Sequence, residues 1–326
     1  MPRSSKIPVL GVDIGGTKVA AALFSPSGEI LSSSRVPMIA NRGAREGLRA
    51  VFAAVDSAMA DGRGKAARCI GISVPGWVDF NRGSVISAAN LPCWRDYPLA
   101  RKIAAHYGLH ALIANDADAA ALAEATWGAG SKSKNVFYVS LGTGIGTGMA
   151  SNRQVCLGRG GSAFEGGHVT INFDGPICPC GKRGCIEIYS SGKAIARAAR
   201  EKLRGREPSR SRILTLAGGR PEAITAEIVS RAANAKDKLA LAVLRDAADY
   251  LAIWLGNIID LLEPGIIIFG GGLGRSMMKF LPRIRKQLNR WAINPRRGQI
   301  PIVRAWFGAE SALVGAAALC FSSPKS

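Results

Sequence analysis

The sequence predicts an α/β protein with an internal duplication. Short apolar runs that read as strands alternate with amphipathic or alanine-rich stretches that read as helices, which is the pattern of an α/β domain. The stretch PVLGVDIGGTKVAAALFS (8–25) is echoed by NVFYVSLGTGIGTGMAS (135–151), and each reads as a strand, a glycine-rich bend and a second strand. We therefore expect two similar halves, each beginning with such a hairpin and continuing into helices.

Composition and length indicate a soluble globular protein of about two domains. The chain has 326 residues, of which 48% are hydrophobic and 20% charged. No stretch approaches the roughly 18 consecutive apolar residues of a membrane span, and the N-terminus has no apolar signal-peptide core. The sequence therefore predicts a cytoplasmic protein without a membrane partner.

The formal net charge of +20 is unusual. The basic residues are scattered, with denser stretches at 193–212 and 275–297, and few aromatic residues stand among them to stack on bases. We therefore expect no nucleic-acid partner. An anionic substrate such as a nucleotide would be attracted by this field.

In the first half, apolar runs between turn residues predict strands. These are residues 7–14, 19–24, 29–36, 68–74 and 111–116. Amphipathic or alanine-rich stretches predict helices at 44–60, 98–107 and 117–127. The strand at 68–74 ends at Pro75-Gly76, where a loop is expected.

In the second half, the strand–bend–strand unit at 135–151 is followed mainly by helices. Helices are predicted at 187–204, 225–234, 238–262, 276–290 and 310–320. Two further strands are predicted at 265–272 and 299–305.

Three glycine-rich segments are suited to binding phosphates: Gly15-Gly16-Thr17-Lys18, Gly142-Thr143-Gly144-Ile145-Gly146 and Gly270-Gly271-Gly272. Glycine lets the backbone approach an anion closely and point successive N–H groups at it. A tight β-turn would explain any one of them alone. Neither a Walker A loop nor a strict Gly-x-Gly-x-x-Gly motif occurs. Asp13, just before the first bend, is a candidate ligand for Mg²⁺, directly or through water, or a cap of that turn.

A carboxylate is the best candidate for a general base. His106 and His110 flank a predicted helix end, and no Gly-x-Ser-x-Gly elbow accompanies His168. Asn115 and Asp116 lie where a strand ends and a helix begins, the edge of a parallel sheet that usually faces a ligand. The alternative is that Asp116 or Asp118 only caps the helix.

The segment CPCGKRGC (178–185) contains three of the seven cysteines. Together with His168, Cys178, Cys180 and Cys185 make the set of one imidazole and three thiolates that tetrahedral Zn²⁺ accepts. A redox role would favour Cys-x-x-Cys in a thioredoxin-like unit, which is absent. With all four positions filled by protein, the zinc would be structural and would hold Glu165, His168 and Glu187 in fixed relation.

In order along the chain, the segments GVDIGGTK, SVPGWVD, NLPCW, ANDADAAALAE, SLGTGIGTG, EGGH and CPCGKRGCIE resemble the ROK sugar kinases. The resemblance covers essentially the whole chain. It implies two RNase H-like domains of the actin/hexokinase type, with the active site in the cleft between them. The smaller domain would comprise residues 1–115 and about 301–326, and the larger one residues 116–300 with the zinc-binding loop.

The resemblance also assigns roles to residues. Asp116 would be the general base that takes the proton of the sugar's primary hydroxyl. The sugar ligands would be Gly76, Asn90, Asn115, Asp116, Glu165, His168 and Glu187. ATP and its phosphates would contact Asp13, Gly15, Gly16, Thr17, Lys18, Gly142, Thr143, Gly144, Gly271 and Gly272. His168 would contact the sugar through one ring nitrogen and zinc through the other.

The function implied is an ATP-dependent hexose 6-kinase that uses Mg²⁺, with glucose as the expected sugar. Family members usually carry Ala-Gly-Glu where this chain has Ala163-Phe164-Glu165, so fructose, mannose, N-acetylmannosamine and N-acetylglucosamine are alternatives. The positive charge leaves polyphosphate open as a donor. A sugar-responsive repressor of the same family would need a helix-turn-helix before the first bend, where only twelve residues precede Asp13. A homodimer or homotetramer is usual for such proteins.

Overall fold

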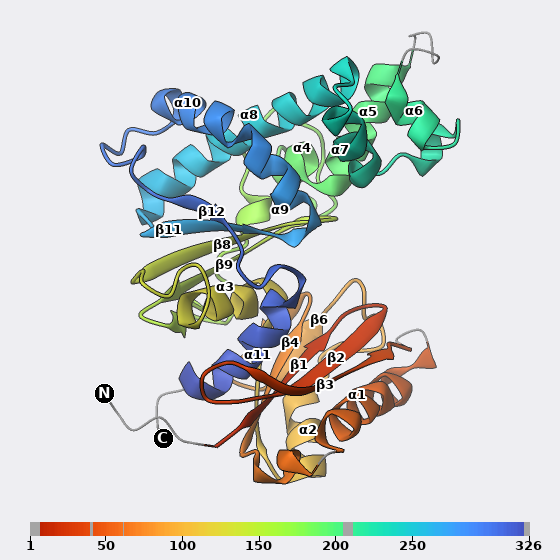
Figure 1. Cartoon of the computed structure of the whole chain (residues 1–326), viewed down its shortest axis with the longest axis vertical. Coiled ribbons are helices and arrows are strands. Elements are labelled where there is room, and N and C mark those ends of the chain that lie inside the picture. The colour runs from red at the N-terminus through yellow and green to blue at the C-terminus, as the bar shows by residue number, and fades with distance from the viewer. Residues whose placement is uncertain (1–6, 40–41, 61, 205–210, 323–326) are drawn as a thin grey trace. The chain divides into compact units, whose positions relative to one another are not determined.

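The computed structural model describes residues 7–39, 42–60, 62–204 and 211–322 (Figure 1). It divides into two compact units. Within the described residues, the first is drawn from Met1–Tyr138, Gly148–Phe164 and Ala305–Ser326, and the second from Val139–Thr147 and Glu165–Arg304. The division differs from the expected boundary at 115/116 because the helix that starts at Asp116 packs on the C-terminal helix and so groups with the first unit.

The first unit contains a five-stranded sheet with strand order β3-β2-β1-β4-β7. Its strands are β1 (Val9–Ile14), β2 (Lys18–Phe24), β3 (Ile30–Pro37), β4 (Cys69–Val74) and β7 (His110–Asn115). β1, β2 and β3 pair antiparallel, whereas β4 is parallel to both β1 and β7. β1, β4 and β7 therefore end at one edge of the sheet, where the candidate polar residues are.

Helices cover both faces of this sheet, which explains the near-continuous apolar runs of β1 and β4. They are α1 (Ala44–Met59), α2 (Leu99–Tyr107), α3 (Asp116–Thr126) and α11 (Ser311–Ser322). Leu10, Val12 and Ile14 belong to one core cluster with the apolar residues of α1 and α2. Val9 belongs to another cluster, with α11, because successive strand residues point to opposite faces.

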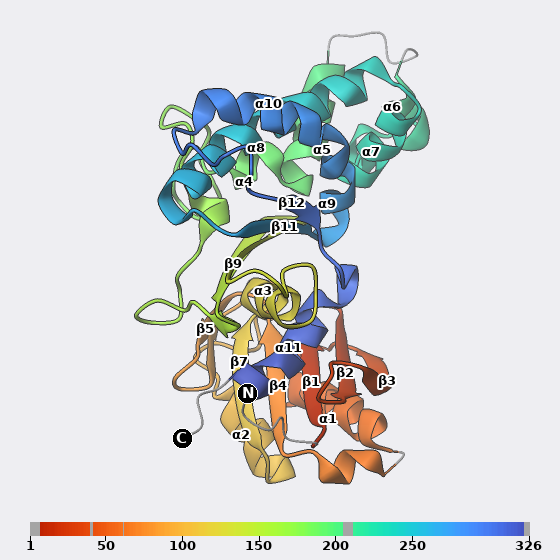
Figure 2. The ribbon, with the colours of Figure 1, turned by 60° about the vertical axis from the view of Figure 1, so that its left-hand side comes forward.

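α11 lies close against the strands (Figure 2). A Cβ at Gly71 would lie 1.6 Å from the carbonyl oxygen of Ala316, so only glycine admits the helix backbone there. A disulfide joins Cys69, the first residue of β4, to Cys320 of α11, across a sequence separation of 251. This pair is not recognisable in the sequence, because neither cysteine belongs to a spaced motif.

After the loop expected at Pro75-Gly76, the chain forms a small hairpin of β5 (Trp77–Asp79) and β6 (Ser84–Ser87), for which no strand was predicted. Strands of three and four residues are too short for a periodicity signal.

The second sheet has strand order β10-β9-β8-β11-β12. Its strands are β8 (Asn135–Leu141), β9 (Ile145–Ser151), β10 (Gln154–Val155), β11 (Ile266–Gly270) and β12 (Ile302–Arg304). When the five strands of each sheet are numbered by their order in the chain, both sheets have the spatial order third, second, first, fourth, fifth. A duplication predicts such a shared strand order. β8 and β9 contain residues of both units.

The second unit carries most of the later helices. They are α4 (Glu187–Ser190), α5 (Gly192–Leu203), α6 (Arg212–Leu216), α7 (Ala226–Asn234), α8 (Lys238–Leu262), α9 (Gly271–Met277) and α10 (Leu281–Trp291). The single helix expected at 187–204 is interrupted at Ser191, whose side chain accepts a hydrogen bond from the N–H of Ala194 and begins α5. The helix expected at 276–290 is likewise divided, into α9 and α10 with a 3₁₀ turn between them.

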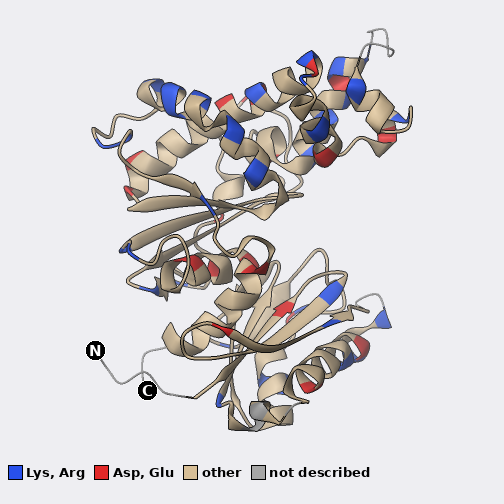
Figure 3. Cartoon of the chain, viewed as in Figure 1, with Lys and Arg blue, Asp and Glu red and all other residues tan. Residues whose placement is uncertain are grey.

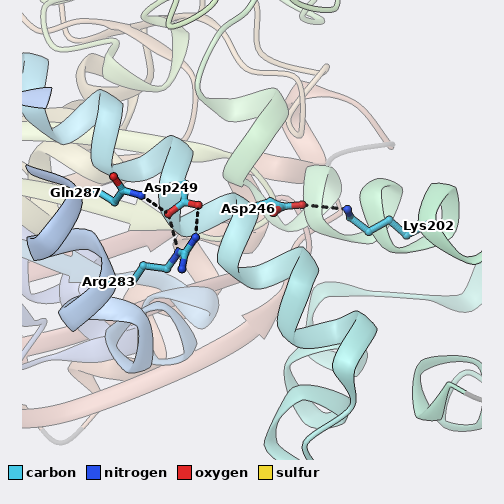
Figure 4. Close-up of polar contacts among 5 residues, drawn as sticks. All are labelled: Lys202, Asp246, Asp249, Arg283 and Gln287. Carbon is cyan, nitrogen blue, oxygen red and sulfur yellow. Dashed lines mark hydrogen bonds and ion pairs between the residues drawn. The ribbon is translucent and has the colours of Figure 1, made fainter. Parts of the chain in front are cut away.

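Ion pairs join α8 to two of the helices that pack against it (Figure 4). Asp249 accepts hydrogen bonds of 2.7 and 2.6 Å from Arg283 of α10, and Asp246 pairs with Lys202 of α5 at 3.1 Å. These pairs are partly exposed and contribute modestly to stability. Among the described residues, no helix is long and apolar enough to cross a lipid bilayer.

Candidate functional site

In the first unit, Asp13 lies near the end of β1, opposite Ser73 of β4. The Ser73 hydroxyl donates a hydrogen bond of 3.0 Å to Oδ1 of Asp13. Burial raises the pKa of Asp13, whereas this hydrogen bond and the charge of Lys18 lower it. Carboxylate oxygens are ligands that Mg²⁺ prefers in proteins. Ser73 was missed in the sequence, where it is one small residue in an apolar strand.

The first glycine bend is a tight turn next to a predicted sugar ligand. The Gly15 N–H donates to the carbonyl oxygen of Lys18 at 2.8 Å, which closes the turn. A Cβ at Gly16 would lie 2.9 Å from both Cβ and the carbonyl oxygen of Asn90. The structure thus brings Gly16 and Asn90 together, and Thr17 and Lys18 are exposed.

Asn115 and Asp116 lie at the junction of β7 and α3. The Asn115 side chain donates to the carbonyl oxygen of Gly76 at 2.7 Å, and its Oδ1 accepts from the N–H of Ala117 at 2.8 Å. Asn115 is therefore the N-cap of α3. Asp116 is the first residue of the helix, with Oδ1 2.9 Å from the same N–H, and is exposed. Asp118 is buried.

In the second unit, three predicted sugar ligands lie near one another. Burial raises the pKa of Glu165, the positive charge of His168 lowers it, and the negative charge of Glu187 raises it. Glu187 Oε2 accepts a hydrogen bond of 2.9 Å from the N–H of Ile145. A Cβ at Gly144 would lie 2.5 Å from that oxygen, so Glu187 also adjoins the second glycine bend.

The four predicted metal ligands converge. The ligand atoms of His168, Cys178, Cys180 and Cys185 all lie within 4.8 Å of one another. Cys178 Sγ is 3.7 Å from His168 Nδ1, and Cys180 Sγ is 3.7 Å from Cys185 Sγ. A tetrahedron with Zn–S bonds of about 2.3 Å has edges of about 3.8 Å. The donor set and its spacing therefore fit Zn²⁺.

A pocket of about 1310 Å³ opens beside the second glycine bend. Its lining includes three residues predicted to contact ATP, Gly142, Thr143 and Gly272. It also includes one predicted sugar ligand, Glu187. Gly271 does not line the pocket. With φ of 73°, it packs against the backbone of Leu141, where a Cβ would lie 2.3 Å from the carbonyl oxygen.

The lining of this pocket is strongly basic. Its cations are Lys193, Arg197, Arg200, Arg231 and Arg275, and its carboxylates are Glu187 and Glu227. Figure 3 shows basic residues on the helices of this region. Lys193, Arg197 and Arg200 share one face of α5, because residues three and four apart are neighbours on a helix. The basic stretch is visible in the sequence, but its place at a pocket was not predicted. The i, i+4, i+7 spacing of its three residues on α5 was the available signal.

Comparison with known proteins gives one family over nearly the whole chain. The ROK family matches residues 9–322. A glucokinase of Streptomyces coelicolor is 35% identical over 312 residues, which are 95% of this chain and 96% of that protein. The crystal structure of a ROK family glucokinase from Streptomyces griseus in complex with glucose and AMPPNP superposes with a TM-score of 0.81 at 35% identity, covering 96% of this chain and 98% of that one.

Regulators are also similar to this chain. A putative xylose repressor of Caldicellulosiruptor sp. is 30% identical over 281 residues, which are 85% of this chain and 69% of that protein. The family and the fold class expected from the sequence motifs are both confirmed.

Proposed function

The chain belongs to the ROK family, and on that premise we propose that it is a glucokinase, which transfers the γ-phosphate of ATP to the 6-hydroxyl of glucose. The observation that carries the proposal is the 35% identity to a glucokinase along 95% of the chain. The polar residues described above supply the groups that this reaction requires. We expect the enzyme in the cytoplasm.

Asp116 is the proposed general base. Its exposed carboxylate stands at the edge where β1, β4 and β7 end, a ligand-facing position in open α/β sheets. As phosphoryl transfer proceeds, the carboxylate takes the proton of the attacking 6-hydroxyl. Asn115 supports it by fixing the start of α3 and the loop at Gly76.

The remaining sugar hydroxyls need paired donors and acceptors. Gly76, Asn90 and Asn115 of the first unit and Glu165, His168 and Glu187 of the second are the proposed ligands. A site built on such hydrogen bonds rejects sugars that leave one of its buried groups unpaired. Fructose, mannose and N-acetylated hexosamines are therefore the competitors to test.

The glycine bends are the proposed phosphate sites. N–H groups of Gly15–Lys18 and Gly142–Gly144 would bind phosphate oxygens, Gly272 would contact the adenosine, and Gly271 would hold the chain against Leu141. The Asp13 carboxylate would hold Mg²⁺ bound with ATP, and this ion supplies charge neutralisation for the phosphates.

Zn²⁺ is the proposed occupant of the cysteine and histidine cluster. His168 would hold the ion through Nδ1, the ring nitrogen near Cys178 Sγ. Its Nε2 would then be left for a sugar hydroxyl, and the orientation of the ring would be fixed. Since four protein ligands fill the coordination sphere, the ion would be structural.

The test is the initial rate with Mg-ATP on glucose, mannose, fructose, N-acetylglucosamine and N-acetylmannosamine. We expect glucose to be preferred and Asp116→Asn to lower kcat about 10²- to 10⁴-fold. Asp246→Asn, which changes a partly exposed carboxylate of α8 (Figure 4), is the control and should keep the wild-type rate. Glucose binding without turnover on any hexose would refute the kinase and favour a sugar-responsive regulator.

The basic pocket favours inorganic polyphosphate as a second phosphoryl donor. Five cations against two carboxylates line it, and an elongated polyanion would be attracted along the α5 face more strongly than a neutral ligand. Inorganic polyphosphate as the sole donor, with glucose and Mg²⁺, tests this alternative. Phosphorylation that Arg231→Gln and Arg275→Gln weaken would support it, and no transfer from polyphosphate alongside normal transfer from ATP would exclude it.

A further inference from the structure

We propose that Thr147 and Trp254 are positioning residues for the acceptor sugar: together they hold the peptide of Gly166, and through it Glu165 and His168. The inference rests on the proposed function, in which Glu165 and His168 bind sugar hydroxyls. All of these residues belong to the second unit. Thr147 lies within the segment SLGTGIGTG but was given no role there, and Trp254 belongs to none of the motifs considered above.

The Gly166 backbone is held from two sides. Its N–H donates a hydrogen bond of 2.8 Å to Oγ1 of Thr147, on β9. Its carbonyl oxygen accepts one of 3.0 Å from the indole Nε1 of Trp254, on α8. The carbonyl oxygen also accepts a hydrogen bond of 3.2 Å from the N–H of Val169, within the turn. Both polar groups of Gly166 are thus bonded to side chains from two different elements.

These hydrogen bonds are shielded from water. Trp254 is fully buried and Thr147 is 7% exposed, and Gly166 is buried. In such surroundings the loss of the Thr147 hydroxyl leaves the Gly166 N–H without a partner, whereas water replaces a lost partner at the surface. The loss of the Trp254 N–H leaves the carbonyl oxygen of Gly166 with only the Val169 N–H. The two contacts therefore constrain the turn more strongly than exposed ones would.

The turn has no room in which to shift. A Cβ at Gly166 would lie 2.7 Å from Thr147 Oγ1 and 3.3 Å from Trp254 Cζ2, and one at Gly167 would lie 2.0 Å from the carbonyl oxygen of Ile145. The two glycines therefore lie directly against β9 and the indole ring. Any rotation of the Gly166 peptide must break a hydrogen bond or collide with a neighbour.

The hydrogen bonds at Gly166 also restrict the positions of Glu165 and His168, because all three residues belong to one short turn. Gly166 follows Glu165 directly, and the N–H of His168 donates to the carbonyl oxygen of Glu165 at 3.0 Å. The same strand β9 also holds Glu187 through the N–H of Ile145. Strand β9 thus sets the relative positions of the three proposed ligands. It holds Glu187 through its backbone, and it holds Glu165 and His168 through the side chain of Thr147.

The experiment compares Thr147→Val and Trp254→Phe, which remove one hydrogen-bonding group each and nearly preserve shape. We expect each to raise KM for glucose about tenfold, the effect of one buried hydrogen bond, with KM for ATP within twofold of wild type. Thr147→Ser, which keeps the hydroxyl, should restore the wild-type KM. Thr215→Val and Trp291→Phe, at exposed positions of the same unit, are matched controls.

A purely structural role would give another pattern: a lower Tm in both variants with KM for glucose unchanged, which overturns the proposal. Zinc content should stay at the wild-type level, so that a change in KM is not due to loss of metal near His168.

Hydrogen exchange on the wild-type protein covers the case in which both variants fail to fold. We expect the Gly166 amide to be protected before glucose is added, because the turn is already held. Free exchange of this amide that becomes slow only with glucose would overturn the proposal. Absence of any kinase activity in the wild type would instead refute the proposed function, and calorimetric glucose binding to the same variants would still test the positioning role.

Discussion

The Ser73 hydroxyl lies 3.0 Å from Oδ1 of Asp13, with the two residues opposite each other on parallel strands. Ser73 is fully buried, so this hydrogen bond sets the orientation of the carboxylate that we assign to Mg²⁺. The two side chains are 60 residues apart in sequence. Only the pairing of β1 with β4 brings them together.

Ser73→Ala should weaken the use of Mg²⁺. Without the hydroxyl, the carboxylate loses its orientation, and we expect the Mg²⁺ concentration for half-maximal rate to rise several-fold, as the loss of a group supporting a metal ligand commonly causes. Rates measured across a Mg²⁺ titration check this. Ser57→Ala, at an exposed position of α1, should leave the titration unchanged. An unchanged titration in Ser73→Ala would argue against Asp13 as the magnesium ligand.

Cys180→Ser should lose zinc. Removing one of four ligands abolishes tetrahedral coordination, and the energy of metal binding that stabilises the loop is lost with it. We expect about one zinc per wild-type chain by elemental analysis, little or none in the variant, and a lower Tm. Cys156→Ser, outside the cluster, should retain the metal. Wild-type protein that binds no zinc would contradict the assignment.

Cys320→Ser should destabilise the first unit. The disulfide closes a loop of 251 residues, and such a cross-link contributes about 2–5 kcal/mol by restricting the unfolded chain. Denaturant unfolding without reductant should show this loss. Reductant should lower the stability of the wild type and of Cys93→Ser, while Cys320→Ser should not respond. Equal responses of all three proteins would mean that the bond does not form in solution.

Tyr138 should make the stability sensitive to alkali. The pKa of Tyr138 is raised to about 12, chiefly by burial. A hydrogen bond with Ser311 opposes this rise, and the negative charges of Glu124 and Asp116 add to it. The pKa in the folded state thus lies above the value of about 10 for an unfolded chain. The neutral phenol therefore contributes stability that is fully present below pH 10 and is lost as pH rises toward 12.

Urea unfolding of the wild type and Tyr138→Phe between pH 9 and 12 tests this. The free energy of unfolding should fall less steeply in the variant above pH 10. Parallel curves would show that Tyr138 does not carry the effect.

Gly315→Ala should disrupt the packing of α11 on α3. The added Cβ would lie 1.7 Å from the carbonyl oxygen of Ala119, so two helix backbones must move apart. We expect a loss of about 3 kcal/mol or more, at the upper end of overpacking effects. Gly160→Ala, where a Cβ meets nothing within 4 Å, is the control. Similar unfolding midpoints for both variants would contradict this packing.

Several elements were predictable because their signals are local. The hairpins at 8–25 and 135–151, the long helix α8 and the Asn115–Asp116 junction follow from periodicity and from turn residues within a few positions. The cysteine and histidine set is compact in sequence, so its convergence was also predictable. The divided helices at 187–204 and 276–290 were not foreseen, because the apolar pattern continues through the breaks.

The sequence by itself determined the fold class, the duplication, the family and the residue types available for phosphate, sugar and metal. The tertiary structure alone decided which distant residues meet: Cys69 with Cys320, Ser73 with Asp13, and Thr147 and Trp254 with Gly166. The reason is physical. Strand and helix patterns depend on neighbours a few residues away, whereas these contacts join residues brought together by strand order, helix packing and the absence of a Cβ.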